Sequence, residues 1–330
     1  MKTLAAWMGT AAVVLSALTT GAAQAEAPLV VDAGLPAYRP ADSLKGEITI
    51  CGSDAMTQVA AAWSEQFRRF HPDVKITLTP ASSSRAIMNV RDRKADFGLL
   101  SREVLPEEVA EFESATGHKP AIMISSMERI AVLVHADNPV EGLTIAELDA
   151  MFSADRLRGG AVSAWSDLGV KTPLGAQTPR VLVRDETTGA PATFRSVILQ
   201  GADFRQDVNR QESYINLVRG VAADQSAIGF AGTMYLLRGI RAVPIAIEKG
   251  QPFVAVDSAE ADAGAYPLVR PQHMVYNLDP ANPPSEVQKE FLRYIFSQLG
   301  QEDVVKSGFD PVPAAPAKIA LEQVGLSSFN

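Results

Sequence analysis

Three short polar segments stand between an expected strand and an expected helix, and their residue types are those that bind anions. The segments are Gly52–Met56, Ser82–Arg85 and Arg184–Gly189. At the start of a helix the first backbone N–H groups lack an intrahelical partner and carry a partial positive charge. Hydroxyl groups, glycine and arginine at such a place complete a pocket for an oxyanion. We therefore predict that this chain recognises a compact anion.

Each segment also has a simpler interpretation that the sequence leaves open. Ser53 is an ordinary helix N-cap residue in one interpretation, and a donor beside the N–H groups of Ala55 and Met56 in the other. The second segment is a polar loop in the simpler interpretation. In the third, Arg184 is either a surface arginine paired with Asp185 or Glu186, or a planar donor facing an anion. The residues predicted from the segments are Ser53, Asp54, Ala55, Met56, Ser83, Ser84, Arg85, Arg184, Thr188 and Gly189.

Length and composition are those of a folded protein with two domains. The chain has 330 residues, of which 47% are hydrophobic and 21% charged. Its net charge of −8 disfavours a nucleic-acid partner, because binding to phosphate backbones needs a basic surface. An anion must therefore be held by local geometry. The single cysteine, Cys51, lies in an apolar run and is expected to be a buried, unreactive thiol.

The N-terminus has the features of a secretory signal. Met1–Lys2 is followed by an apolar stretch over 4–18 and by the small residues Ala23–Ala25. The stretch falls short of the ~20 residues that span a bilayer, so a membrane anchor is the weaker interpretation. We predict a signal peptide over 1–25, cleaved after Ala25, a leader over 26–43 and a soluble exported protein.

The hydrophobic pattern predicts alternating strands and helices, which is typical of a parallel sheet. The first unit has strands at 47–51, 74–78 and 96–100, with helices at 55–70 and 85–93. After Asp137–Pro139 the alternation restarts, with a capping box at Thr144–Glu147. Further on we expect alternating strands over 243–256, a solvated loop over 257–264, an extended return over 266–277 and one long helix from Ser285 to Leu299.

Sequence signatures of enzymes are scarce. The four histidines are scattered, one cysteine excludes zinc sites with several thiolates, and no nucleophile elbow, P-loop or dinucleotide fingerprint occurs. We predict that the protein is not an enzyme and has no catalytic residue, metal or cofactor.

Eight segments in order resemble the landmarks of PstS-like periplasmic phosphate-binding proteins, the substrate-binding proteins of ABC transporters. They are Gly52–Met56, Ala95–Arg102, Leu143–Phe152, Trp165–Gly169, Arg184–Gly189, Ile228–Phe230, Tyr266–Leu268 and Gly308–Val312. The resemblance covers about residues 46–313. It implies the type II periplasmic-binding fold, an α/β fold of two lobes, each a mostly parallel sheet flanked by helices, with the ligand cleft between the lobes.

The resemblance also implies a set of ligand contacts. These are the backbone of Ala55 and Met56, with Ser83, Ser101, Arg184, Thr188, Gly189 and Ala190. Ala55 and Ala190 stand where phosphate receptors commonly have threonine, so two hydroxyl donors are missing. Ser101–Arg102 stands where some members have an aspartate that accepts the phosphate proton. Either Asp54 or Asp185 takes this role here, or no residue does. Arg85 and Arg102 add positive charge, which either compensates for the lost hydroxyls or admits another anion.

Combined with the pattern, the resemblance divides the chain into a first lobe over 44–125 and 268–330 and a second lobe over 126–267. The function that it implies is a periplasmic receptor that delivers phosphate, or a related tetrahedral oxyanion, to the membrane permease of an ABC importer. One alternative is an extracellular regulatory or adhesive protein of the same fold with weak or altered anion binding. Another is a phosphate-ester hydrolase, which would need a nucleophile and a base or metal that the sequence does not show.

Overall fold

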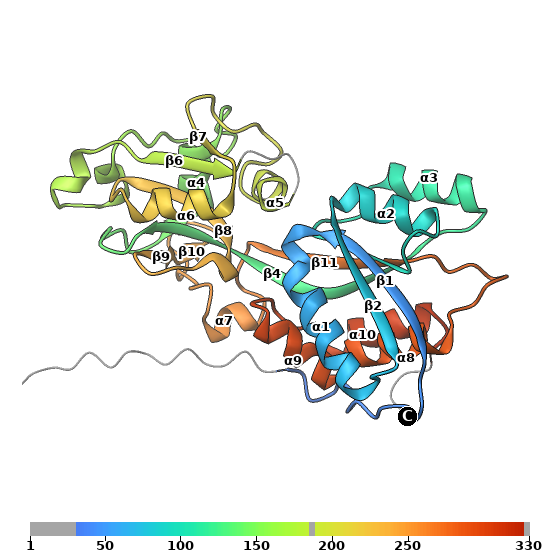
Figure 1. Ribbon diagram of the computed structural model, residues 1–330. Coiled ribbons are helices and arrows are strands. Elements are labelled where there is room, and N and C mark those ends of the chain that lie inside the picture. The colour runs from blue at the N-terminus through green and yellow to red at the C-terminus, as the bar shows by residue number, and fades with distance from the viewer. Residues whose placement is uncertain (1–30, 185–188, 327–330) are drawn as a thin grey trace, which may run out of the picture.

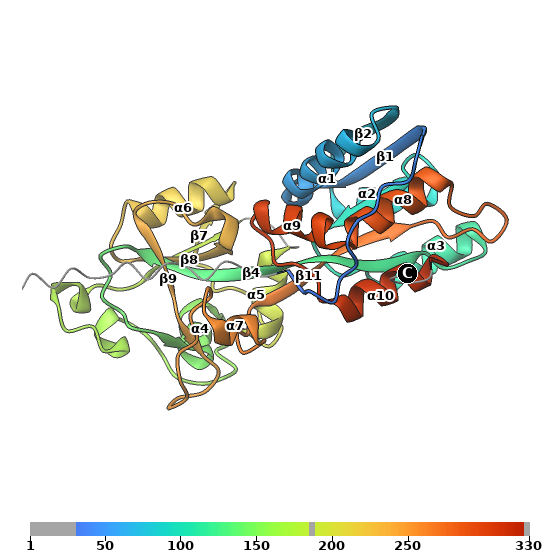
Figure 2. The ribbon, with the colours of Figure 1, turned by 90° about the horizontal axis from the view of Figure 1, so that it is seen from below.

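The protein has two lobes, and the long strand β4 (Ala121–His135) runs from the first into the second, while the chain returns to the first lobe at β11 (Val269–Tyr276) (Figure 1). The computed structural model describes residues 31–184 and 189–326. The predicted signal peptide over 1–25 lies outside the described residues. Figure 2 shows β4 continuing from one lobe into the other, with helices on both sides of the sheet.

The strands of both lobes form one curled sheet in the order β2-β1-β3-β11-β4-β8-β6-β7, with β9 also paired to β4. Four further strands belong to the first lobe: β1 (Gly46–Ser53), β2 (Val74–Ala81), β3 (Phe97–Leu100) and β11 (Val269–Tyr276). The second lobe adds β6 (Arg180–Arg184), β7 (Asn209–Gln211), β8 (Ala227–Gly232) and β9 (Ile240–Val243), and a separate pair, β5 (Leu143–Thr144) with β10 (Ile245–Ala246).

The sheet is mixed, with a parallel part in each lobe. Strand β1 pairs in parallel with β2 and β3, and β6 pairs in parallel with β7 and β8. These are the pairings that the βα alternation predicts. Strands β4 and β11 run antiparallel to each other and to their other neighbours, β8, β9 and β3. The antiparallel strands therefore lie in the middle of the sheet, where the two lobes join.

Helices cover both faces of this sheet. In the first lobe they are η1 (Asp54–Met56), α1 (Thr57–Phe70), α2 (Ser83–Arg91), α3 (Pro106–Thr116), α8 (Glu286–Ile295), α9 (Gln298–Lys306) and α10 (Ala314–Gln323). In the second lobe they are α4 (Ile145–Phe152), η2 (Trp165–Leu168), η3 (Pro173–Ala176), α5 (Ala190–Val197), α6 (Tyr214–Ala222), η4 (Thr233–Tyr235) and α7 (Ala259–Asp262). The capping box predicted at Thr144 is present at the start of α4.

Apolar stripes on the helices build the cores. Val59, Trp63 and Phe67 of α1 are fully buried, and burial of each such side chain stabilises the fold by about 1.5–3 kcal/mol. The Trp63 indole N–H donates to the carbonyl of Gly300 at 2.8 Å, which fixes α1 against α9. One cluster of buried apolar residues falls within 130–268, and two others fall within 35–123 and 274–326.

The segment over 31–44, part of the expected leader, packs against the first lobe. Leu35 is buried there, and the N–H of Gln298 donates to the carbonyl of Pro36 at 2.9 Å. The Asp32 carboxylate accepts a hydrogen bond from the N–H of Ala314, at the start of α10. This segment therefore ties the beginning of the described chain to its last helix.

Three local expectations were wrong. The helix expected from Ser285 to Leu299 is two helices, because Ser297 caps α9: its hydroxyl accepts from the Gly300 N–H at 3.2 Å and donates to the Tyr294 carbonyl at 2.7 Å. The loop expected over 257–264 contains α7, which Ser258 caps. The strands expected over 243–256 reduce to the end of β9, β10 and a bridge between Ile245 and Val254.

Candidate functional site

Three predicted ligand residues meet at one edge of the first lobe's parallel strands. Ser53 ends β1, Ser83 begins α2 just after β2, and Ser101 follows β3. Parallel strands have their carboxyl ends at the same edge of a sheet, and ligands of open α/β sheets bind outside that edge. The strand order thus brings together residues up to 48 positions apart.

Hydrogen bonds connect the three serines into one polar chain. The hydroxyl oxygens of Ser53 and Ser101 are 2.9 Å apart, and the Ser101 N–H donates to the Ser83 hydroxyl at 3.3 Å. Ser101 is only 8% exposed, whereas Ser53 and Ser83 are partly exposed. The chain therefore runs from a buried residue toward the surface, with hydroxyl groups that can both donate and accept.

The capping pattern separates the two interpretations of these serines. Ser53 precedes η1 but makes no side-chain capping bond, so its hydroxyl is not used as an ordinary N-cap. Helix α2 is capped by Ser82, whose hydroxyl accepts from the Arg85 N–H at 3.2 Å. The hydroxyl of Ser83 is thus left to bond Ser101. In η1, Met56 is buried, Ala55 is half-buried and Asp54 is exposed.

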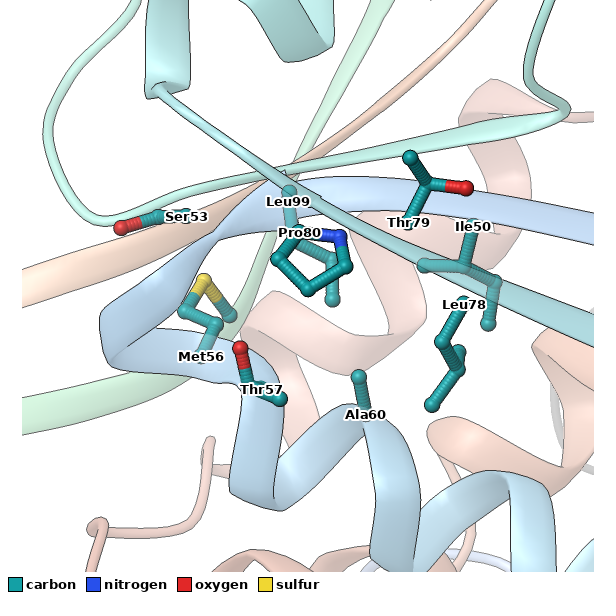
Figure 3. Close-up of a pocket in the computed structure, with 10 residues that line it drawn as sticks. Ile50, Ser53, Met56, Thr57, Ala60, Leu78, Thr79, Pro80 and Leu99 are labelled. Carbon is teal, nitrogen blue, oxygen red and sulfur yellow. The ribbon is translucent and has the colours of Figure 1, made fainter.

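A small pocket lies beside this chain, with about 240 Å³ of space that includes open solvent. It is formed by the ends of β1 and β2 and the start of α1, and most of its lining is apolar: Ile50, Gly52, Ser53, Met56, Thr57, Ala60, Leu78, Thr79, Pro80 and Leu99. Figure 3 shows the Ser53 hydroxyl pointing away from Leu78 and Pro80. The polar chain and the apolar pocket are therefore on different sides of Ser53.

Arg102 and Ser84 make contacts with an acid of the protein itself. The Arg102 guanidinium donates to both carboxylate oxygens of Glu108, at 2.8 and 2.6 Å, and to the Ser84 hydroxyl at 2.8 Å. Burial raises the pKa of Glu108. Hydrogen bonds from the Arg102 guanidinium and the Leu105 N–H lower this pKa by more than burial raises it, so it lies below the usual 4.5. The anion-binding role predicted for Arg102 and Ser84 gains no support from these contacts. Arg85 is exposed at the start of α2.

In the second lobe, Arg184 ends β6 and lies against an aromatic ring. Its guanidinium carbon is 5.9 Å from the centre of the Tyr214 ring, and one terminal nitrogen donates to the Gln211 carbonyl at 3.3 Å. Arg184 is half-buried, and its guanidinium lies over the Tyr214 ring instead of extending into solvent. The quadrupole of the ring attracts the positive charge.

The next helix start after Arg184 lies at Gly189, one of the predicted ligand residues. Gly189 precedes α5 with a φ of +68°, a conformation that glycine adopts without strain, and Ala190, 1% exposed, is the first helical residue. Pro191 has no N–H, so the donors at this helix start are the N–H groups of Gly189, Ala190 and Ala192. Figure 1 shows α5 on the side of the second lobe that faces the first. Thr188 and Asp185 lie outside the described residues.

Two residues of β11 that sequence reasoning missed hold the loop after β3. Arg270 donates to the Ser101 carbonyl at 2.7 Å, and His273 Nδ1 lies 3.1 Å from the Arg102 carbonyl. A carbonyl only accepts, so Nδ1 carries the hydrogen. Both contacts join positions about 170 residues apart, and no motif spacing in the sequence indicates them.

In the described chain, no group of three or more His, Cys, Asp or Glu side chains could hold a metal ion. Among the same residues, no helix has the length and hydropathy to cross a bilayer. A larger hollow lies in the second lobe between segments 139–144, 168–172 and 249–253, and no predicted anion ligand lines it.

The Arg102–Glu108 contact predicts a stability effect. Arg102→Leu leaves a nearly buried carboxylate without its cation, so we expect the free energy of unfolding to fall by about 3 kcal/mol. The double variant Arg102→Leu with Glu108→Gln removes that charge and should recover part of the loss. Denaturant titration at neutral pH measures both. Equal losses in the two variants, or a loss of oxyanion affinity in Arg102→Leu of more than about threefold, would contradict this assignment.

His273 predicts a dependence of stability on pH. Burial lowers its pKa below 6.5 by more than the Arg102 carbonyl and the charge of Glu103 raise it. Below pH 6.5 the unfolded chain takes up a proton that the folded chain does not, so stability is lost as the pH falls through this window. The slope is at most about 1.4 kcal/mol per pH unit for each such histidine, and His71 contributes in the same direction.

The measurement is chemical unfolding in phosphate-free buffer from about pH 7.5 to about pH 5.5. His273→Gln can still donate to the Arg102 carbonyl but does not titrate, so its loss of stability over this range should be smaller than that of the unmodified protein. Identical slopes in the two proteins would show that His273 is not responsible.

Comparison with known proteins places the chain in a family. Residues 37–298 match the PBP superfamily domain. The phosphate-binding protein PstS of Pseudomonas aeruginosa is 33% identical over 314 residues, which cover 94% of this chain and 97% of that protein. Protein SphX of Synechococcus elongatus is 24% identical over 83% of this chain and 80% of its own.

Solved structures show the same fold. An ABC-type phosphate transport receptor from Vibrio cholerae matches with a TM-score of 0.61 at 21% identity, over 81% of this chain and 100% of that chain. PstS from Borrelia burgdorferi matches with a TM-score of 0.56 at 16% identity, over 81% and 99%. The predicted two-lobed α/β fold is thus confirmed. The chain belongs to the PBP superfamily and, within it, to the family of PstS-like phosphate-binding proteins.

Proposed function

We propose that this chain is a periplasmic solute-binding receptor for phosphate, or a related tetrahedral oxyanion, that delivers it to the membrane permease of an ABC importer. The observation that carries the proposal is the 33% identity to the phosphate-binding protein PstS of Pseudomonas aeruginosa along 94% of the chain. The Pseudomonas aeruginosa relative is named a phosphate-binding protein, which fits a role in binding rather than catalysis. The predicted signal peptide supports export.

In this proposal the anion lies between two sets of donors. The first lobe supplies the hydroxyls of Ser53, Ser83 and Ser101 with the backbone of η1, and the second supplies Arg184 and the helix start at Gly189–Ala190. The separate apolar clusters within 130–268 and within the rest of the chain support lobe boundaries at 44–125 with 268–330, and at 126–267. Closure of the lobes completes the donor shell and excludes water, which strengthens each hydrogen bond.

The proposal explains how an acidic protein binds an anion. With a net charge of −8 the long-range field repels phosphate, so affinity must come from donors at short range. Hydroxyl groups, backbone N–H groups at helix starts and a guanidinium over Tyr214 are donors of this kind. No nucleic-acid partner, metal or cofactor is part of the proposal.

Calorimetric titration with phosphate, sulfate, arsenate and molybdate tests this function, and we expect saturable heat with phosphate. Arg184→Ala should weaken phosphate binding at least about tenfold, because a charged hydrogen bond is worth roughly 1.5–3 kcal/mol. Arg180→Ala is the matched control: it removes an exposed arginine from the other end of β6, where it pairs with Asp224. No heat with any of the four anions at millimolar concentrations would reject the proposal.

A second candidate is an extracellular regulatory or adhesive protein with weak or altered anion binding. Ala55 and Ala190 motivate it, because neither supplies a hydroxyl donor. In that case Arg184→Ala would leave both ligand-induced stabilisation and cellular phosphate uptake unchanged, which separates the two candidates.

Restoration of a hydroxyl at position 55 should increase affinity in the receptor. Ala55 is half-buried in η1, just before α1, so Ala55→Thr adds a donor with little change elsewhere, and we expect phosphate binding to tighten by about tenfold. Ala55→Val has the same shape without the hydroxyl. If both variants bind alike, Ala55 does not face the anion.

A further inference from the structure

A buried arginine at the junction of the lobes holds a predicted ligand residue in place. Arg270 is on β11 and is 6% exposed. One terminal nitrogen donates to the Ser101 carbonyl at 2.7 Å, while Nε and the other terminal nitrogen bind a single oxygen of Glu128 at 2.7 and 2.5 Å. The guanidinium thus bridges Ser101 and a carboxylate of β4.

Glu128 stands where the strands of the two lobes meet. It is 4% exposed and accepts a further hydrogen bond from the Gln272 amide at 2.9 Å. Its other carboxylate oxygen lies close to Gly232, the last residue of β8 in the second lobe: a Cβ there would be 2.1 Å from Glu128 Oε1. The Arg270–Glu128 pair therefore touches β4, β8 and β11 at once.

Each polar atom of Ser101 has a different partner. Its N–H donates to Ser83, its hydroxyl bonds Ser53 and its carbonyl accepts from Arg270. Ser83 and Ser53 are predicted anion ligands. Arg270 is not, and of these three partners it alone lies on a strand at the junction of the lobes. The position of the Ser101 peptide, and through it the spacing of the three hydroxyls, depends on Arg270.

The charges of the pair cancel, which decides how Arg270 can act. Because the Glu128 carboxylate forms an ion pair with the Arg270 guanidinium, the two charges together add little to the electrostatic field at the anion. A planar guanidinium can bind a carboxylate and a carbonyl in fixed directions at the same time, whereas a lysine ammonium is a point charge without that fork. The effect of Arg270 is therefore one of geometry.

We propose that Arg270 is a positioning residue for anion binding: through its bond to the Ser101 carbonyl it sets the serine chain, and through Glu128 it links that chain to the strands joining the lobes. This inference rests on the proposed function as an anion receptor and identifies a residue outside the set that sequence motifs indicate. Arg270 need not touch the anion to affect its affinity.

Arg270→Lys tests the proposal, with phosphate affinity measured by calorimetry well below the melting temperature of each protein. We expect affinity to fall by about tenfold, with charge conserved. Arg129→Lys is the matched control. Arg129 is also a buried arginine at the junction, and its described partners include Asp310 at 2.7 Å and the Val256 carbonyl at 2.9 Å. Both variants should lose thermal stability, but Arg129→Lys should keep its affinity within about twofold.

Glu128→Gln provides a second variant if Arg270→Lys does not fold. The glutamine has the shape of the glutamate but makes weaker, uncharged hydrogen bonds to the Arg270 guanidinium. We therefore expect phosphate affinity to fall, by less than in Arg270→Lys.

The outcomes separate this inference from the function on which it rests. If the unmodified protein binds no phosphate, the proposed function fails. If it binds phosphate and both Arg270→Lys and Glu128→Gln keep its affinity within about twofold, the function stands and the positioning role of Arg270 is overturned. An equal loss of affinity in Arg129→Lys would also overturn it, because the effect would then belong to the junction in general.

Discussion

Strand β4 makes ladder hydrogen bonds in both lobes, and the two-lobed arrangement depends on this. Its residues 121–129 pair with β11, and residues 130–135 pair with β8 and β9. Buried backbone groups must keep their partners, so neither lobe can release β4 without unpairing part of its sheet. The partners of β4 change near Arg129 and Ile130, so this is the position where the two halves of the sheet share the fewest ladder bonds. The buried groups of Glu128 and Arg270 lie at this position.

In the proposed site, local geometry would substitute for overall charge. The serine chain is hydrogen-bonded within itself, so an incoming anion exchanges existing bonds for new ones, and the net gain for each bond is modest. What such a site offers is preorganisation: hydroxyls already converge before the ligand arrives. Arg102 is neutralised by Glu108, and the described contacts of Arg184 include the Tyr214 ring and the Gln211 carbonyl.

The sequence predicted those parts of the structure that depend on local pattern. The parallel pairing of β1 with β2 and β3 follows from alternating elements, and the approach of Ser53 and Ser83 follows from parallel strand ends. Ser101 was indicated only by the family resemblance. Contacts made by tertiary packing could not be predicted in this way. Arg270 on the neighbouring strand β11 reaches Ser101, which is 169 positions away in the sequence. Two local features were missed for another reason, because the hydrophobic pattern does not indicate them: Glu108 binds Arg102 from six positions along the chain, and Ser297 caps α9 and so separates it from α8.

The single cysteine makes this protein convenient for spectroscopy. Cys51 is 1% exposed on β1, and the Asn89 amide of α2 donates to its sulfur at 3.0 Å. Maleimide dyes react with accessible thiolates, so this native sulfur should stay unlabelled while engineered cysteines on the surface of each lobe react. A fluorophore pair attached in this way would report the separation of the two halves in real time, with no need to delete the native thiol.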